Sequence, residues 1–180
     1  MAFRDHLLGA LGRIARDVLR TAARPQRRTP RQPTTVRERR APALGDSYPG
    51  DYRGLPRVTY DPHPGTLPDP GEVVWTWVPY EEDHTQGKDR PVLLVGRDGD
   101  WLLALPLTSE DHDADAAQEA AEGRYWMDIG KGSWDAQGRP SEVRLNRVIR
   151  VDPRGVRRVS GRLSQATFER VAGGMREHLG

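Results

Sequence analysis

The sequence predicts a small antiparallel β-sheet, strongly curved or partly closed into a barrel, followed by one C-terminal helix. Five to seven short apolar runs lie between residues 71 and 162, separated by turn residues, and this spacing is typical of small barrels. All five tryptophans lie between Trp75 and Trp134, which places the core in the same part of the chain. After Ser164 the apolar residues recur with helical spacing.

The first three predicted strands form the centre of this sheet. They cover residues 72–78, 92–95 and 101–105, and the last two flank an Asp-Gly pair, a strong signal for a tight hairpin. A polar loop leads to Arg90 at the start of the second strand, while the third stops at Pro106 and delivers Thr108 just past its end. Antiparallel pairing therefore places the Arg90 guanidinium beside the Thr108 hydroxyl at one edge of the sheet.

The remaining elements are predicted from shorter patterns. The acidic, Ala-rich residues 110–122 form either a short helix or a loop. Further strands are expected over residues 124–129, 142–145, 147–151 and 156–162. Ser164 is a suitable N-cap for a final helix through Leu179. Gly173 and Gly174 each cost that helix about 1 kcal/mol, so tertiary packing has to hold it.

The first 70 residues form two segments outside the predicted folded domain of residues 71–180. Residues 1–23 have the pattern of a basic amphipathic helix, which packs on its own domain or a second copy, docks on a partner, or lies on an anionic membrane. Residues 24–70 hold ten of the fifteen prolines and form a Pro/Arg-rich linker, disordered in its first part. The rest of the linker is expected to lie extended over the domain, anchored by Tyr48, Tyr52, Leu55, Val58 and Tyr60.

The charge of the chain is unevenly distributed. Residues 1–40 hold eleven arginines and three acids, a net +8, so the remaining residues carry −6 to give the formal +2. A basic tail suits nucleic acid, an anionic membrane or an acidic partner, or is a solvated arm. The absence of cysteine excludes disulfides, thiolate metal sites and a cysteine nucleophile. No apolar run approaches the ~20 residues of a membrane span and no convincing signal peptide is present, so a cytoplasmic location is expected.

Arg90 and Thr108 are the strongest candidates for chemistry. A guanidinium presents a rigid fork of donors that suits phosphate, and a threonine hydroxyl donates to a second phosphate oxygen. Together they are able to hold a phosphodiester and stabilise the charge that develops when it is attacked. Arginine is a poor general base, so a base has to come from elsewhere, with nearby candidates at Glu81, Glu82, Asp83 and His84.

Other patterns carry less weight. Residues 111–115 combine three aspartates with His112, which are possible metal ligands, but such acidic runs are usually solvated loops, and no metal is predicted. Trp75, Trp77 and Trp101 are able to stack on bases, although a place in the core is favoured for the first two. The Gly-Lys-Gly-Ser run at residues 130–133 lacks the spacing of a phosphate-binding loop.

Residues 71–180 resemble the PemK/MazF family of bacterial toxins. The resemblance lies in the runs GEVVWTWVP, QGKDRPVLLVG, ALPLTS and SEVRLNRVIRVDPRGVRRVSGRLSQATFERV. The resemblance implies an SH3-like barrel of the CcdB/PemK type with a C-terminal helix, a homodimer, and an endoribonuclease that needs no metal or cofactor. In such enzymes the 2′-hydroxyl of single-stranded RNA attacks the adjacent phosphate. Arg90 then acts in acid–base or transition-state roles, and Thr108 holds the phosphate.

The resemblance also implies further contacts and partners. A cognate antitoxin peptide is expected to block the RNA groove. A related possibility, which the same fold hosts, is inhibition of a topoisomerase, and DNA binding is expected beside RNA binding. The body is acidic, so Arg144 and Arg147 are expected to supply local positive charge. Substrate contacts are predicted for Ser109, Glu82, His84, Lys88 and Arg147.

An alternative of a different class is a non-catalytic module that binds nucleic acid or protein on the toxin fold. The charge asymmetry suggests that the basic arm folds over the acidic residues 110–122 and masks the groove. Deleting residues 1–70 then raises RNA binding or activity, whereas unchanged activity rules out masking.

Overall fold

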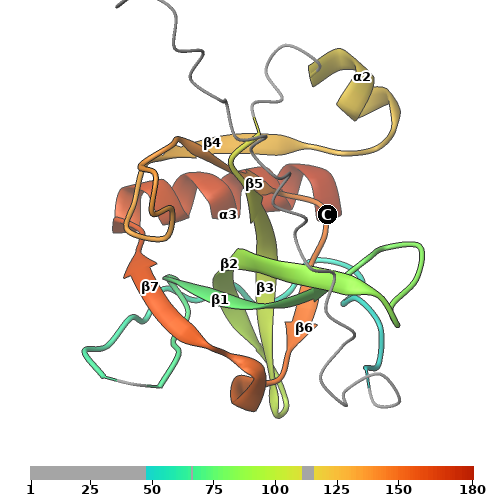
Figure 1. The fold of residues 1–180 in the computed structure, drawn as a ribbon. Coiled ribbons are helices and arrows are strands. Elements are labelled where there is room, and N and C mark those ends of the chain that lie inside the picture. Colours follow the sequence, from blue (N-terminus) through green and yellow to red (C-terminus); the bar gives the residue numbers. More distant parts are fainter. Residues whose placement is uncertain (1–47, 66, 111–115) are drawn as a thin grey trace, which may run out of the picture. The chain divides into compact units, whose positions relative to one another are not determined.

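The computed structural model describes residues 48–65, 67–110 and 116–180, and the helix predicted over residues 1–23 lies outside them. The strands are β1 (Glu72–Pro79), β2 (Gly87–Asp98), β3 (Trp101–Thr108), β4 (Trp126–Gly130), β5 (Ser141–Arg144), β6 (Ile149–Val151) and β7 (Arg158–Arg162) (Figure 1). The helices are α2 (Ala116–Ala121), a 3-10 turn (Pro153–Gly155) and α3 (Gln165–Leu179). No helix among these described residues is long and apolar enough to cross a membrane.

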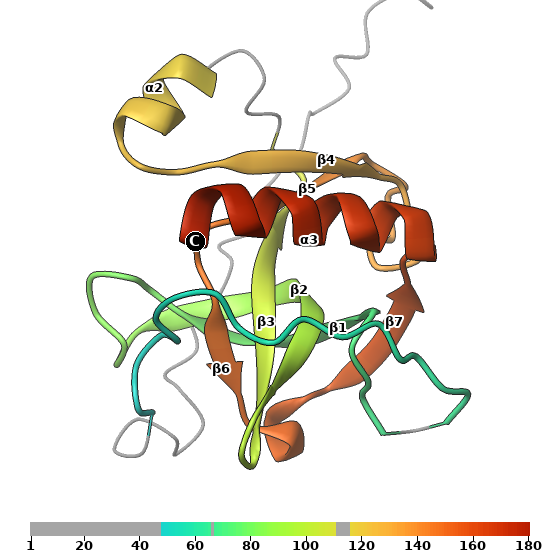
Figure 2. The ribbon, with the colours of Figure 1, turned by 180° about the vertical axis from the view of Figure 1, so that it is seen from behind.

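All seven strands pair antiparallel, in the order β4-β5-β3-β2-β1-β7, with β6 also paired to β3. The predicted antiparallel sheet with a C-terminal helix is therefore confirmed. Figure 2 shows α3 lying alongside β4. The three central strands are longer than predicted: β1 by one residue, β2 at both ends and β3 at its end. β5 is shifted by one residue, and β4, β6 and β7 each begin two residues later than predicted.

The end of β3 shows why the prediction stopped too early there. Proline has no N–H to donate to a ladder, so it usually marks the limit of a strand. β3 pairs with β6 over residues 102–104 and with β5 at Leu107 and Thr108. Pro106 lies between these two stretches and faces only Val92 of β2. The strand continues through Pro106 and includes Thr108.

The start of β2 also differs from the prediction. β2 begins at Gly87, so Arg90 is the fourth residue of the strand and lies opposite Thr76 of β1. A side chain added at Gly87 would meet the Val78 carbonyl oxygen at 2.3 Å. Glycine therefore lets the polar residues before Arg90 join the β1–β2 ladder.

Both faces of the central strands are buried, which explains their continuous apolar sequence. Val73 and Val74 point to opposite faces of β1 and belong to different core clusters. The larger cluster includes the α3 side chains Phe168, Val171 and Met175. Trp75 and Trp77 are only half-buried and belong to neither cluster, so their predicted place in the core is wrong. Val73 on the same face of β1 is fully buried, so that face is covered incompletely only where Trp75 and Trp77 lie, and the buried tryptophan among the described residues is Trp134.

Helix α3 begins as predicted, at Ser164, whose hydroxyl accepts from the Thr167 N–H at 3.1 Å. Gly174 explains why glycine is tolerated inside the helix. A Cβ at this position would lie 2.7 Å from Leu145 Cδ1 and 3.1 Å from Met127 Cε. A side chain there would collide with the residues that connect the helix to β4 and β5.

Substituting Gly174→Leu is expected to lower the free energy of unfolding by about 1–3 kcal/mol, because the new side chain overpacks this contact. Gly173→Ala is the matched control, since a Cβ there has no heavy atom closer than 3.9 Å. It should instead raise stability by up to about 1 kcal/mol through helix propensity. Urea denaturation followed by circular dichroism compares the two. Equal midpoints would show that Gly174 is not a packing site.

Residues 48–62 precede the sheet and run along its surface. The Tyr52 N–H donates to the Val148 carbonyl at 2.8 Å, and the Thr59 N–H donates to the Val95 carbonyl at 2.9 Å. The Tyr60 hydroxyl donates to the Leu163 carbonyl at 2.8 Å. Tyr52 and Tyr60 pack against the larger core cluster, whereas Leu55 is exposed. Figure 2 shows this segment in teal, crossing the sheet below α3.

Candidate active site

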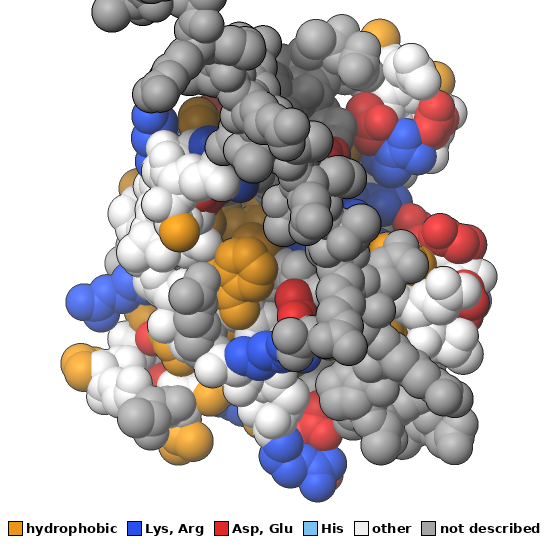
Figure 3. Space-filling model, in the orientation of Figure 1, with side chains coloured by type: hydrophobic (Ala, Val, Ile, Leu, Met, Phe, Trp, Pro, Cys, Tyr) orange, Lys and Arg blue, Asp and Glu red, His pale blue; other side chains and the backbone are white. Residues whose placement is uncertain are grey.

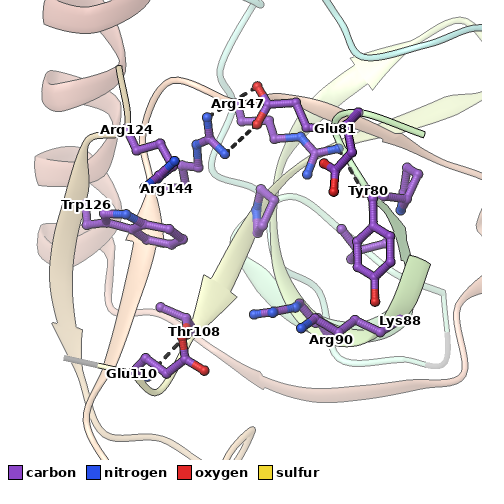
Figure 4. Close-up of a pocket in the computed structure, with 14 residues that line it drawn as sticks. Tyr80, Glu81, Lys88, Arg90, Thr108, Glu110, Arg124, Trp126, Arg144 and Arg147 are labelled. Atoms are coloured by element: carbon purple, nitrogen blue, oxygen red, sulfur yellow. Dashed lines mark hydrogen bonds and ion pairs between the residues drawn. The ribbon is translucent and has the colours of Figure 1, made fainter. Parts of the chain in front are cut away.

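A cavity of about 320 Å³ opens where β1, β2, β3 and β5 meet the β1–β2 loop. Figure 4 shows its labelled side chains. β2 contributes Lys88 and Arg90, and β3 contributes Thr108 at its last position. The pairing of β2 with β3 thus brings together the guanidinium and hydroxyl that the sequence placed at one edge.

Arg90 is the arginine of the cavity that has no carboxylate partner among the described residues. Within the described part of the chain, no residue forms a hydrogen bond or ion pair with its guanidinium. Burial lowers the Arg90 pKa, while the charge of Glu110 opposes that shift. A guanidinium stays protonated at neutral pH even so. Arg90 therefore offers a complete set of donors to a ligand in the cavity.

Thr108 offers a hydroxyl whose position is fixed. The residue is 6% exposed and pairs with Glu142 of β5. Its Oγ1 accepts from the Glu110 N–H at 3.1 Å. Because that bond uses an acceptor site, the hydroxyl proton remains available for donation to a ligand.

The other arginines of the cavity are paired with carboxylates. Arg144 Nη1 lies 2.8 Å from Glu81 Oε2, and Arg147 Nε lies 2.8 Å from Asp51 Oδ2. Arg124 binds both Glu119 and Glu122 of the α2 region. Figure 3 shows acidic and basic side chains side by side next to α2. Among the residues that the structure describes, Arg90 and Lys88 are the cavity cations without a carboxylate partner.

The predicted substrate contacts divide into two groups. Glu82, Lys88 and Arg147 line the cavity, whereas Ser109 and His84 do not. The His84 ring packs edge-on against Tyr48, with ring centroids 5.1 Å apart, and its Nε2 lies 4.0 Å from Asp51 Oδ1. Ser109 is half-buried and follows the last strand residue of the wall.

The four candidate bases also separate. Glu81 is held by Arg144. The Asp83 carboxylate accepts bonds from Thr85 and Gln86 and so holds the turn of the loop. The bonds from Thr85 are the main reason that its pKa lies below the ordinary value. Glu81 and Glu82 both line the cavity, and of these two Glu82 is the one without an ion-pair partner among the described residues.

The sequence analysis missed some cavity residues, notably Tyr80, Glu110, Arg124 and Trp126. Glu110 could have been predicted from the sequence, because it follows Thr108 by two residues. Trp126 could not have been predicted, because it is brought to the cavity by the pairing of β4 with β5, in which it lies opposite Arg144. Among the described residues no group of three His, Asp or Glu side chains is arranged to hold a metal. The aspartates and histidine of residues 111–115 lie outside that part of the chain.

Comparison with solved structures finds MazF toxins. A crystal structure of MazF from Deinococcus radiodurans is 19% identical, with a TM-score of 0.45, and the match covers 63% of this chain and 96% of that one. A MazE-MazF complex from the same organism is 17% identical over 62% and 94%, with a TM-score of 0.42. The Mycobacterium tuberculosis toxin MazF-mt6 is 15% identical over 59% and 94%, with a TM-score of 0.40.

The sequence itself gives the stronger assignment. No curated protein matches the chain significantly. Residues 69–179, more than half of the chain, match the family model described as the PemK-like, MazF-like toxin of type II toxin-antitoxin systems. This chain therefore belongs to the PemK-like, MazF-like toxin family.

Proposed function

We propose that this protein is a metal-independent endoribonuclease that cleaves single-stranded RNA through attack by the RNA's own 2′-hydroxyl. The observation that carries the proposal is the Arg90 guanidinium, left without a carboxylate partner among the described residues, in one cavity with the buried Thr108 hydroxyl. Membership of the toxin family supports the same activity.

The cavity has the groups that such a reaction needs. A new bond forms between the 2′-oxygen and phosphorus, and the bond from phosphorus to the 5′-oxygen breaks. Negative charge grows on the non-bridging oxygens, where Arg90 and Thr108 donate hydrogen bonds. The products are a 2′,3′-cyclic phosphate and a 5′-hydroxyl.

Proton transfer falls to other residues, because Arg90 keeps its proton. The carboxylates of Glu82 and Glu110 line the cavity, and neither forms an ion pair within the described residues. Either is suited to accept the 2′-hydroxyl proton. The Lys88 ammonium, 5.9 Å from the Tyr80 ring centroid, is a donor for the departing 5′-oxygen.

The proposed partners follow from the family. A cognate antitoxin is expected to cover this cavity with a peptide and to compete with RNA, and the active form is expected to be a homodimer. A synthetic antitoxin segment that inhibits cleavage competitively would support the first proposal.

The test is cleavage of a long single-stranded RNA by the purified full chain in EDTA. We expect fragments that end in a 2′,3′-cyclic phosphate, which mass spectrometry identifies. A matched RNA with a 2′-deoxy nucleotide at the mapped site should resist cleavage there, because it lacks the nucleophile. Cleavage that needs an added metal, or that proceeds equally well at the 2′-deoxy nucleotide, would contradict the mechanism.

One observation favours a second candidate, a non-catalytic binding module. Carboxylates neutralise Arg124, Arg144 and Arg147, and RNA binding depends on positive charge. Tight RNA binding without any cleavage in the same assay would support this module.

A further inference from the structure

Arg147 is fixed at two points of its guanidinium. Its Nε donates to Asp51 Oδ2 at 2.8 Å, and its Nη2 donates to the Pro79 carbonyl at 2.9 Å. The side chain is only 10% exposed, yet it lines the cavity with Arg90 and Thr108 (Figure 4). Nη1 is left without a partner among the described residues.

Asp51 contacts Arg147 from outside the cavity wall, so it does not occupy the space of a ligand. Both carboxylate oxygens are engaged, since Oδ2 binds Arg147 while Oδ1 accepts from the Tyr48 hydroxyl at 2.6 Å. Burial, and then the bond to Asp51, raise the Tyr48 pKa well above its ordinary value.

The backbone around Asp51 is tied to the chain that carries Arg147. Tyr52 bonds the Val148 carbonyl, and Arg150 Nη1 donates to the carbonyls of Gly50 and Asp51 at 2.9 and 3.2 Å. Gly50, Asp51 and Tyr52 precede residue 69, where the match to the family model begins. The extension therefore supplies a support for the site that the matched domain does not contain.

We propose that Asp51 is a positioning residue, which orients the Arg147 guanidinium toward a second phosphate of the RNA strand in the cavity. This inference rests on the proposed function. A long arginine side chain has many rotamers, and a carboxylate at Nε together with a carbonyl at Nη2 selects one of them. Supporting side chains commonly set the direction of a binding group in this way.

Whether the removal of Asp51 weakens or strengthens RNA binding distinguishes an orienting role from a purely electrostatic one. Asp51 is negative and close to the cavity, so its removal strengthens the attraction for a polyanion if only charge matters. If Asp51 orients Arg147, its removal weakens RNA binding instead. Asn at this position has no negative charge and keeps only one of the two oxygens that accept from Arg147 and Tyr48, so the charge-assisted bond to Arg147 is lost.

The experiment uses the full chain and a non-cleavable 2′-O-methyl RNA. Asp51→Asn should weaken binding about tenfold, the scale of one lost hydrogen bond to a charged group. Asp135→Asn is the control, because it removes another Arg–Asp pair, Arg139 with Asp135 at 2.8 Å, outside the cavity and apart from the contacts of Asp51. It should change affinity less than twofold.

A double-mutant cycle with Arg147→Ala completes the test. Asp51→Asn should have no further effect when Arg147 is absent, since it acts through that side chain. Binding by Asp51→Asn that equals or exceeds the wild type, or a loss that persists without Arg147, would overturn the inference.

A readout that needs no RNA separates this inference from the proposed function. In the wild type the Arg147 Nε–H should give a protected side-chain signal by NMR, and Asp51→Asn should abolish it. A wild-type chain that does not cleave RNA would refute the proposed function, and the NMR signal would still test the orienting contact. Cleavage and binding by Asp51→Asn at wild-type levels would refute the inference alone.

Discussion

Replacing Arg90 with alanine is expected to lower the rate of RNA cleavage by about 100-fold or more. The loss of one aligned donor to a developing oxyanion commonly costs about 10²–10³ in rate, and Arg90 is also one of the two cavity cations without a carboxylate partner among the described residues. The fold should survive, because no described residue depends on a bond to its guanidinium. Single-turnover cleavage in EDTA measures the effect.

Arg97→Ala is the matched control on the same strand. Arg97 is exposed, pairs with Asp69 at 3.4 Å and lies outside the cavity, so its replacement should leave the rate near wild type. Arg90→Lys distinguishes the fork of donors from the charge alone, and should recover only part of the activity. Equal rates for the Arg90 and Arg97 alanine variants would remove Arg90 from the mechanism.

Replacing Trp134 with alanine is expected to lower the free energy of unfolding by about 3–5 kcal/mol, as for other large core residues. The side chain is 4% exposed, and its indole N–H donates to Ser141 Oγ at 3.0 Å. It also fills the space over Gly132, where a Cβ would lie 2.1 Å from the ring. Urea denaturation followed by circular dichroism gives the midpoint.

The neighbouring exposed residue provides the control, because Lys131→Ala alters the same loop without touching the core. Trp134→Phe keeps part of the ring and loses the hydrogen bond, so it should fall between alanine and wild type. That variant remains informative if the alanine variant does not fold. A Trp134→Ala midpoint equal to that of Lys131→Ala would show that the loop contributes nothing to the core.

Local patterns predicted the parts of the fold that local physics determines. The Asp-Gly turn predicted the β2–β3 hairpin, and Ser164 predicted the start of α3. Because the hairpin fixes which strand ends meet, it also predicted that Arg90 and Thr108 would lie close together. These features depend on neighbours in sequence or on one turn.

Features that depend on contacts between distant segments could not be predicted from local sequence patterns. Asp51 and Arg147 are 96 residues apart, and no periodicity connects them. Trp126 reaches the cavity only because β4 pairs with β5. The tryptophans of β1 were assigned to the core because they share one face of the strand, but how far that face is covered depends on elements that are distant in sequence.

The sharing of β3 among β2, β5 and β6 has a consequence for the binding of any ligand at Thr108. Thr108 lies at the end of a strand that three neighbours hold in register. The ladder fixes the Thr108 backbone and the Glu110 N–H holds its hydroxyl oxygen, so much of the conformational entropy of placing that group is lost during folding and not during binding. Because Thr108 is already held in place, ordering it should add little to the entropic cost of binding a ligand in the cavity.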